Sequence, residues 1–240
     1  MIQSLTKLQE SRMLEIKQFW LDYIFSCKNS LNREQAKIEI DWLYKLAGCD
    51  QPIVIYVDSP LGCQYAVAYL KEFAKLYPHI FKKSQVRSQV GSQVWSQVWS
   101  QVWSQVESQV GSQVRSQVGS QVWSQVESQV IPFENFASYG SVSDYGWISF
   151  MDFFKEIGVV NNKDYDKFRR ILLSGVYDMI QLNGFCIVSN MPSKILTDSQ
   201  GRLHNKTGPA IEFRDGYCQY FVEGKAVFVP QPGDKYSFSI

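Results

Sequence analysis

The residues with the strongest recognition chemistry lie in a tandem array, in which the word Ser-Gln-Val-X is repeated twelve times from Ser84 to Ile131. Only the fourth residue of each word changes, and this variable column carries indole, guanidinium and carboxylate groups. Trp and Arg are enriched at the energetic centres of protein interfaces, and aromatic rings also stack on nucleic-acid bases. A constant frame with one changing position therefore predicts a binding surface. Its candidate contact residues are Arg87, Trp95, Trp99, Trp103, Glu107, Arg115, Trp123 and Glu127.

The charge of the variable column favours a protein partner over a nucleic acid. Its two Arg are cancelled by its two Glu, and in the whole chain 24 Lys and Arg balance 23 Asp and Glu. Such a balance gives no strong attraction toward nucleic acid or an anionic membrane. An equally favoured alternative is that the Trp side chains pack on the flanking domain or on a second chain. Neutral slippage of the coding repeat would also produce the variation without selection for binding.

Three further candidates lie where apolar runs end in polar turns. Asp58 and Ser59 follow one run, and Asn190 follows another with the same pattern. Backbone N–H groups at a helix start bind anions, so these turns are weak candidates for an anion site or an enzyme site. A structural role is the stronger expectation, because Ser59 suits a helix N-cap and Pro60 the first helical position.

The other reactive side chains predict neither a metal nor a cofactor. A lone His204 among turn residues is usually a hydrogen-bonding brace rather than part of a cluster with Asp198, Asn205 and Asp215. Cys63 lies near an expected helix start, where a thiol pKa can fall, but no His is near it in sequence. The five Cys lack Cys-x-x-Cys spacing, which suits reduced thiols in a cytoplasm. We find no signal peptide and no apolar run of membrane-spanning length, and we expect a cytoplasmic protein without membrane contact.

The flanking segments predict an α+β fold. Apolar residues recur at helical spacing from Leu5 to Cys27, and Asn32 and Gly48 suit the N-cap and the stop of a second helix. We expect the apolar runs at 53–57 and 185–188 to lie side by side in one sheet. The other expected elements are a helix from Pro60 to Leu76, helices at 147–157 and 165–182, and an antiparallel meander at 201–230 with turns at Asp215-Gly216 and Glu223-Gly224.

Three conformations remain open for the array. In a regular α-helix the four-residue word overshoots the 3.6-residue turn by about 40°, so the Val column would spiral and leave no lasting apolar face. In an extended chain Ser and Val face one side while Gln and the variable residue face outward. Regular turns would then coil the chain into a β-solenoid that resembles the pentapeptide-repeat right-handed β-helix. We expect this β-solenoid in preference to a helix packed on the flanking domain, with a disordered Gln-rich segment as the third alternative.

An ordered set of motifs surrounds the array. It comprises Pro52 to Pro60, Trp147 to Phe154, Gly201-Arg202-Leu203-His204-Asn205, Gly208-Pro209-Ala210 and Arg214-Asp215-Gly216. From about Ile38 onward the chain resembles an uncharacterised bacterial family, a domain of unknown function with Gln-Leu or Gln-Val tetrapeptide arrays between the same flanks. The resemblance implies that array and flanks form one unit and that array length differs between members. It implies no activity.

These observations predict an α+β protein in four segments, at 1–83, 84–131, 132–200 and 201–240, with 1–83 and 132–240 in one domain. We expect a non-enzymatic recognition module that displays its variable column to a protein partner, in bacterial conflict or defence. One alternative is a self-assembling structural repeat, since Gln ladders and exposed Trp favour lateral association. The other is an enzyme that acts at the strand-end turns.

Overall fold

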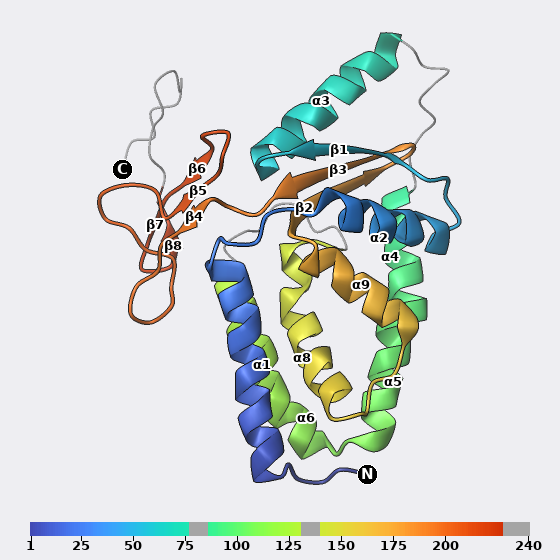
Figure 1. Cartoon of the computed structure of the whole chain (residues 1–240), viewed down its shortest axis with the longest axis vertical. Helices are drawn as coiled ribbons and strands as arrows, with labels where there is room; N and C mark the ends of the chain where they lie inside the picture. Colours follow the sequence, from blue (N-terminus) through green and yellow to red (C-terminus); the bar gives the residue numbers. More distant parts are fainter. Residues whose placement is uncertain (77–85, 131–139, 228–240) are drawn as a thin grey trace.

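Helices dominate the architecture, as Figure 1 shows. The computed structural model describes residues 1–76, 86–130 and 140–227. The expected α+β class is confirmed, because small sheets of two or three strands accompany the helices. In these ranges the helices outside the array are α1 (Lys7–Phe25), α2 (Arg33–Leu46), α3 (Pro60–Leu76), the 3-10 helix η4 (Val142–Asp144), α8 (Tyr145–Glu156) and α9 (Lys163–Leu173).

Capping residues set the boundaries of the first two helices. Thr6 and Gln9 form a capping box at α1, in which the Gln9 N–H donates to Thr6 Oγ1 at 3.2 Å and the Thr6 N–H donates to Gln9 Oε1 at 3.0 Å. Asn32 caps α2 as expected, since its Oδ1 accepts the Gln35 N–H at 3.0 Å. Gly48 follows the end of α2 with a φ of 68°, a left-handed conformation that glycine adopts at low cost.

A three-stranded sheet of order β1-β3-β2 adjoins these helices. β1 (Ile53–Val57) and β3 (Phe185–Asn190) pair in parallel, with Ile55 opposite Ile187, so the expected neighbouring of the two apolar runs is confirmed. β2 (Val176–Leu182) pairs with β3 in the antiparallel direction. In Figure 1 α3 lies on one side of this sheet and α2 on the other.

The helix expected at 165–182 is wrong in its second half. α9 ends at Leu173, and Gly175, with a φ of 85°, turns the chain into β2. A Cβ at Gly175 would lie 2.9 Å from the Ser30 carbonyl oxygen, so this turn requires glycine. The residues of β2 are mostly buried on both faces. The strand therefore lacks the alternation of apolar and polar residues that would distinguish it from a helix.

Short antiparallel strands form the C-terminal segment. β4 (Lys194–Ile195), β5 (Ile211–Glu212) and β6 (Cys218–Gln219) make one sheet, and β7 (Phe221–Val222) pairs with β8 (Lys225–Ala226). Both expected turns are confirmed, because Asp215-Gly216 joins β5 to β6 and Glu223-Gly224 joins β7 to β8. Residues 228–240, which end the expected meander, lie outside the described residues.

The described part of the array is a helical hairpin, so the expected β-solenoid is wrong. The chain turns at Val110 and Gly111, where the Gly111 N–H donates to the Ile2 carbonyl oxygen at 2.8 Å. Ser84, Gln85 and Ile131 lie outside the described residues. The first limb consists of α4 (Val86–Gln93), the π-helix η1 (Val94–Trp99) and α5 (Ser100–Gln109), and the second of α6 (Ser112–Val118), the π-helix η2 (Gly119–Trp123) and α7 (Ser124–Val130).

The π-helical turns explain how a four-residue word fits a helix. An α-helix holds 3.6 residues per turn with i→i+4 bonds, whereas π turns close i→i+5 bonds and hold more residues. A mixture of the two moves the average toward four residues per turn, and the Val column then stays on one face. Every array Val from Val86 to Val126 is at most 3% exposed. The prediction that a helical array would have no lasting apolar face is therefore wrong, because it holds only for a uniform α-helix.

About four residues per turn place the four columns of the array a quarter-turn apart. Val faces the core, and Ser, two positions away, faces solvent, with Ser100 alone half-buried among the described array Ser. Several Ser hydroxyls donate to a carbonyl of the preceding turn, as Ser100 Oγ does to the Ser96 oxygen at 2.8 Å. Gln and the variable residue occupy the two flanks. In an antiparallel hairpin, one of these two columns therefore faces the other limb, and the second column faces away from it.

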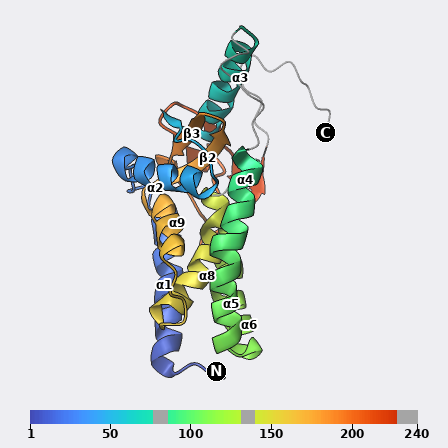
Figure 2. The same ribbon diagram turned by 90° about the vertical axis from the view of Figure 1, so that its right-hand side faces the viewer.

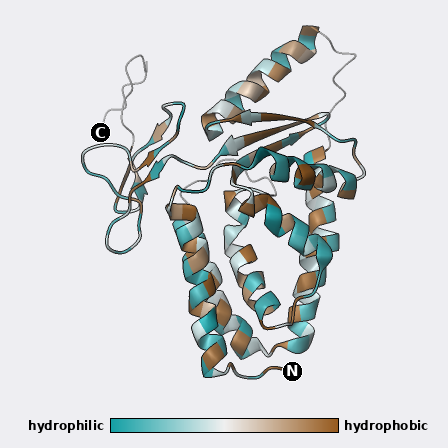
Figure 3. Cartoon of the chain, viewed as in Figure 1, coloured by the Kyte–Doolittle hydropathy of each residue, from teal (hydrophilic) through white to brown (hydrophobic). Residues whose placement is uncertain are grey.

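The hairpin joins the other helices in one hydrophobic core. In Figure 2 α8 lies between the hairpin on one side and α1 with α9 on the other. Buried residues of α1, α2, α8 and α9 form one cluster with the Val column. Figure 3 shows hydrophilic and hydrophobic residues interleaved along both limbs, as helices with one core-facing side require.

Candidate interaction site

The two halves of the variable column meet across the hairpin. Trp99 and Trp123 each lie twelve residues from Gly111, and their rings meet edge to face with centroids 5.7 Å apart. Nearer the tip, the guanidinium of the half-buried Arg115 donates to the backbone carbonyl oxygen of Glu107 at 3.4 Å. The antiparallel turn brings equivalent words together, so the variable column lines the seam between the limbs.

Helix α8 supplies aromatic rings to this seam. Trp147 lies edge to face on Trp99 with centroids 4.8 Å apart. Phe150 contacts Trp103 and Trp123, with centroids 5.7 and 5.5 Å apart. Such ring pairs add about 0.5–1.5 kcal/mol each beyond the area that they bury. Three of the four array Trp are thus half-buried packing residues, which is the alternative that the sequence left open.

A glycine on α8 allows the second limb to approach. A Cβ added at Gly146 would lie 2.9 Å from the Cβ of Glu127 and 3.0 Å from Cδ1 of Trp123. Real Cβ atoms do not come this close to other side chains, so a larger residue at this position would push the second limb away from α8. Gly146 therefore sets the depth at which Trp123 enters the seam.

The outer part of the variable column remains open to solvent. Trp95 is 57% exposed, although its ring contacts that of Trp99 with centroids 6.1 Å apart. Arg87, Glu107 and Glu127 are also exposed. The column is therefore divided between residues that pack in the seam and residues that a partner can reach.

The fixed Gln residues dock the array onto its neighbours, a role that the sequence reasoning missed. On the first limb, Gln105 Nε2 donates to the Asn161 carbonyl oxygen at 3.1 Å, and Gln105 Oε1 accepts the Asn161 N–H at 2.9 Å. On the second limb, Gln125 Oε1 accepts from Lys17 Nζ of α1 at 2.9 Å. The Gln flanks thus face outward, toward the α8–α9 connection on one side and α1 on the other. The sequence does carry a signal for this role, because Gln occupies the second position of every word. A polar side chain that must keep a particular partner cannot vary.

The strand-end candidates come together and bind one another. Because β1 and β3 are parallel, Asp58 and Asn190 lie at one sheet edge, where Asn190 Nδ2 donates to Asp58 Oδ1 at 2.6 Å. The hydroxyl of the buried Ser59 accepts the Gly62 N–H at 3.0 Å, which confirms the expected N-cap. The same hydroxyl donates to Asp215 Oδ2 at 2.5 Å. These polar groups therefore tie the β1–α3 turn to the β5–β6 turn.

Two buried titratable groups lie near this turn. Burial raises the pKa of the Cys63 thiol well above its usual range, so the helix start does not produce a reactive thiolate. Burial also raises the pKa of Asp178 to about 6, although the Met179 N–H and the charge of Arg87 lower it. Asp178 Oδ1 accepts the Met179 N–H at 2.8 Å, and its Oδ2 has no hydrogen-bond partner among the described residues. At neutral pH the Cys63 thiol is therefore protonated, whereas the Asp178 carboxyl group is mostly ionised.

His204 is a brace, as expected. Its Nδ1 accepts the Glu223 N–H at 3.0 Å and so holds the β7–β8 turn. Asp198 pairs instead with Arg202, whose Nη2 lies 2.7 Å from the Asp198 Oδ2. The suspected cluster around His204 does not form.

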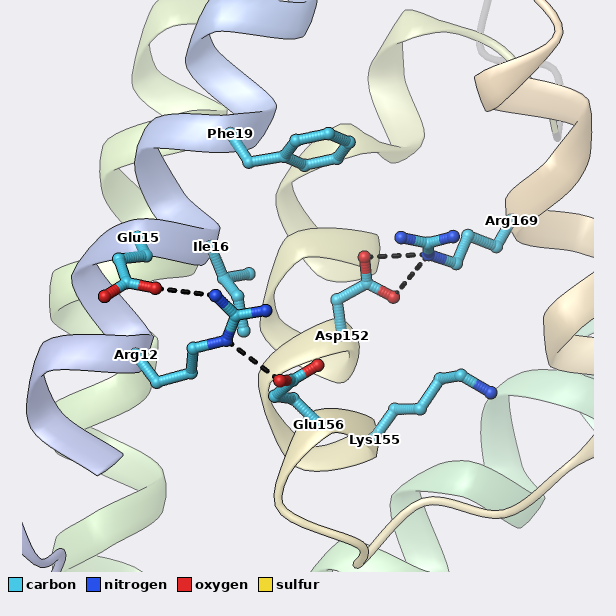
Figure 4. A pocket seen from close by; sticks show the side chains of 8 residues that line it. All are labelled: Arg12, Glu15, Ile16, Phe19, Asp152, Lys155, Glu156 and Arg169. Carbon is cyan, nitrogen blue, oxygen red and sulfur yellow. Dashed lines mark hydrogen bonds and ion pairs between the residues drawn. The ribbon is translucent and has the colours of Figure 1, made fainter. Parts of the chain in front are cut away.

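A polar pocket of about 480 Å³ lies between α1, α8 and α9 (Figure 4). The Asp152 carboxylate accepts from Arg169 Nε at 2.7 and 2.8 Å. It also accepts from Trp20 Nε1 at 3.0 Å and from the Tyr165 hydroxyl at 2.9 Å. Cations and carboxylates pair across the pocket, which gives it no preference for a charged ligand. Its lining, which the sequence reasoning missed, consists of Arg12, Glu15, Ile16, Phe19, Asp152, Lys155, Glu156 and Arg169.

Within the described ranges, no helix is both long and apolar enough to cross a membrane. In the same part of the chain, no three His, Cys, Asp or Glu side chains gather as metal ligands would. No family model, no curated protein and no solved structure matches the chain.

Proposed function

We propose that this protein is a non-enzymatic recognition module, in which the exposed part of the variable column contacts a protein partner. The observation that carries the proposal is the exposure of Trp95, an indole that is 57% exposed while its ring rests against Trp99. An ordered Trp loses little conformational freedom on binding, and Trp is among the residues enriched at interface hot spots.

The rings behind Trp95 support this role. Trp95, Trp99 and Trp103 follow one another with centroids 6.1 and 5.6 Å apart. Trp99 in turn rests on Trp147 of α8. The exposed ring is the outer member of an anchored stack, so its orientation is set before a partner arrives.

The four columns of the array have different structural roles, so the exposed variable residues can be substituted without loss of the core or docking contacts. Val fills the core and Gln docks the limbs, so neither contact depends on the residues at 87, 95, 107 and 127. We therefore assign partner contact to these four positions and a packing role to Trp99, Trp103 and Trp123. The exposed set carries one Arg and two Glu, a mixture that favours protein over nucleic acid.

We place the module in a bacterial cytoplasm, with a role in bacterial conflict or defence. This setting extends the resemblance of the flanking motifs and the variation within the array. Such a role requires only that the residues facing the partner vary while the Ser, Gln and Val positions stay constant.

Photocross-linking in the native host tests the proposal. A benzophenone amino acid replaces Trp95 in one variant and Ser104, an exposed member of the fixed Ser column, in the control. We expect one discrete protein to be cross-linked from position 95 and none from position 104. Equal capture from both positions, or no capture from position 95, contradicts the assignment.

A further inference from the structure

The pocket between α1, α8 and α9 carries balanced charge (Figure 4). Its volume of about 480 Å³ is within the roughly 300–1,000 Å³ of small-molecule sites. Three cations and three carboxylates belong to its described lining, namely Arg12, Lys155, Arg169, Glu15, Asp152 and Glu156. These charges sum to zero, so the pocket favours a ligand whose own net charge is zero.

Arg169 lines the pocket with a guanidinium whose two outer nitrogens are uncommitted. Only its Nε donates to Asp152, at 2.7 and 2.8 Å from the two carboxylate oxygens. Among the described residues, neither Nη1 nor Nη2 of Arg169 has a hydrogen-bond partner. The guanidinium is held in place, because its Cζ also lies 5.7 Å from the centroid of the Trp20 ring. A planar guanidinium binds a carboxylate through two parallel hydrogen bonds, so Arg169 is prepared for the carboxylate of a ligand.

A free acceptor lies one helical turn away on α8. Glu156 follows Asp152 by four residues, and its Oε1 accepts from Arg12 Nε at 2.9 Å. Its Oε2 has no hydrogen-bond partner in the described ranges. The Glu156 side chain is 45% exposed, so a ligand can reach this oxygen. The pocket thus offers an acceptor for an ammonium group, about 6 Å along α8 from the carboxylate that holds the guanidinium.

The other charged groups of the pocket are engaged within the chain. Arg12 Nη1 lies 2.6 Å from Glu15 Oε2, and Lys155 pairs with Asp166 of α9. What the pocket leaves for a ligand is therefore a pair of donors at one end and an acceptor at the other. A zwitterion complements this arrangement, whereas the carboxylates oppose a ligand with several negative charges.

Phe19 gives the pocket an apolar wall at the guanidinium end. Trp20 Nε1 donates to Asp152 at 3.0 Å, whereas Arg12 contacts Glu156, so α1 and α8 run in opposite directions. Phe19 therefore lies at the end where Asp152 holds the guanidinium, and it is 46% exposed. An apolar side chain beside the carboxylate of a ligand would cover this ring.

We propose that this pocket binds a dipeptide with free termini and an apolar C-terminal residue. The C-terminal carboxylate accepts from the outer nitrogens of Arg169, and the N-terminal ammonium donates to Glu156 Oε2. Consecutive Cα atoms are about 3.8 Å apart, so the termini of an extended dipeptide are about 6 Å apart, which matches four residues of α-helix. A free amino acid holds its charges only about 2.5 Å apart, and a tripeptide is about 3.5 Å too long. The pocket uses no residue of the array, so this site is independent of the recognition proposal.

Isothermal titration calorimetry of the full chain tests the need for both charges. Gly-Leu carries both, its N-acetyl form lacks the ammonium, and its C-terminal amide lacks the carboxylate. We expect Gly-Leu to bind with a dissociation constant on the order of 0.1 mM. Each blocked form should bind about tenfold more weakly or worse, because it loses a charged hydrogen-bonding group. Absence of binding by Gly-Leu at millimolar concentration, or equal binding by all three ligands, overturns the proposal.

A variant of the acceptor ties this binding to the pocket. Glu156→Gln removes the partner of the ammonium, so it should weaken Gly-Leu about tenfold and leave the N-acetyl form unchanged. Glu72→Gln is the matched control on α3, because it also removes an exposed carboxylate from an ion pair, 2.6 Å from Lys75 Nζ. Circular dichroism shows whether both variants are folded. Unchanged affinity for Gly-Leu in Glu156→Gln, or the same loss in Glu72→Gln, contradicts the assignment of the site.

Peptide length tests the spacing of the two ends. Free leucine and Gly-Gly-Leu have the same terminal groups as Gly-Leu at different separations. Both should bind about fivefold more weakly or worse, because neither reaches Arg169 and Glu156 together without strain. Tighter binding of either one than of Gly-Leu overturns the assignment of a dipeptide.

Discussion

Trp99 and Trp123 meet edge to face with centroids 5.7 Å apart, although they are 24 positions apart in the sequence. The contact exists because the array turns at Gly111 and returns along itself. Variable positions at equal distance from the turn thereby become neighbours. A repeated sequence thus acquires a specific tertiary structure, in which the residue chosen in one limb affects the packing of the other.

Truncation of Trp99 should cost far more stability than truncation of Trp95. Trp99→Ala removes ring contacts with Trp123 and Trp147 and should lower the free energy of unfolding by about 3 kcal/mol. Trp95→Ala removes a mostly exposed ring and should change that free energy by about 0.5 kcal/mol. Urea denaturation followed by circular dichroism measures both. Equal losses in the two variants would contradict the division of the variable column.

Two glycines should respond to the same substitution with opposite signs. Gly146→Ala places a Cβ against Glu127 and Trp123 and should destabilise the fold by about 1–3 kcal/mol. Gly119→Ala meets no atom within 4 Å, and Ala is more favourable than Gly in a helix by about 0.5–1 kcal/mol. Thermal unfolding distinguishes the two. Stabilisation by Gly146→Ala would mean that α8 and the second limb are not in close contact.

Asp178 should make stability depend on pH. Burial raises its pKa from 3.8 to about 6 in the folded chain, so the native state holds this proton more tightly than the unfolded state. The resulting stability is fully present below about pH 4 and is lost as the pH rises through about 6. Asp178→Asn has no such proton, so from pH 4 to pH 8 it should gain on the order of 3 kcal/mol relative to the wild type. Urea denaturation at both pH values measures the gain, and a difference that does not vary with pH would refute it.

The docking role of Gln should show at Gln105 and not at Gln113. Gln105→Ala removes two hydrogen bonds to the Asn161 backbone and should lower the free energy of unfolding by about 1–2 kcal/mol. Gln113 is exposed near the tip of the hairpin, so Gln113→Ala serves as the control and should be nearly neutral. Hydrogen exchange at the Asn161 amide gives a local readout. Unchanged protection in Gln105→Ala would argue against docking.

Local signals in the sequence predicted much of the flanking fold. Asn32 and Ser59 cap the helices that they precede, and glycine turns at 216 and 224 close the expected hairpins. These features depend on a few consecutive residues. β2 was mistaken for a helix because its burial on both faces removes the alternation that marks a strand.

The array and the pocket depend on information that is not local. The four-residue period excludes a uniform α-helix, but it does not reveal that π turns in η1 and η2 restore a straight Val face. The turn at Gly111 could not be predicted, because Gly91 and Gly119 occupy the same position in other four-residue repeats of the array. The pocket unites α1 with α8 and α9, which are more than a hundred residues away in the chain. The sequence names all the charged and Trp positions of the variable column as candidates alike, and only the structure separates the exposed Trp95 from the Trp residues of the seam.

A distance between the two limbs tests the hairpin most directly. Ser96 and Ser124 are exposed residues of opposite limbs, 15 positions before and 13 positions after Gly111, and spin labels on non-canonical amino acids at these positions avoid the five native Cys. The ring contact of Trp99 with Trp123 keeps the two limbs side by side, so the hairpin predicts a narrow distribution at a distance clearly shorter than one continuous helix of 28 residues. A distance of about 42 Å, as expected for 28 residues of one continuous helix, would contradict the hairpin and with it the seam between Trp99 and Trp123.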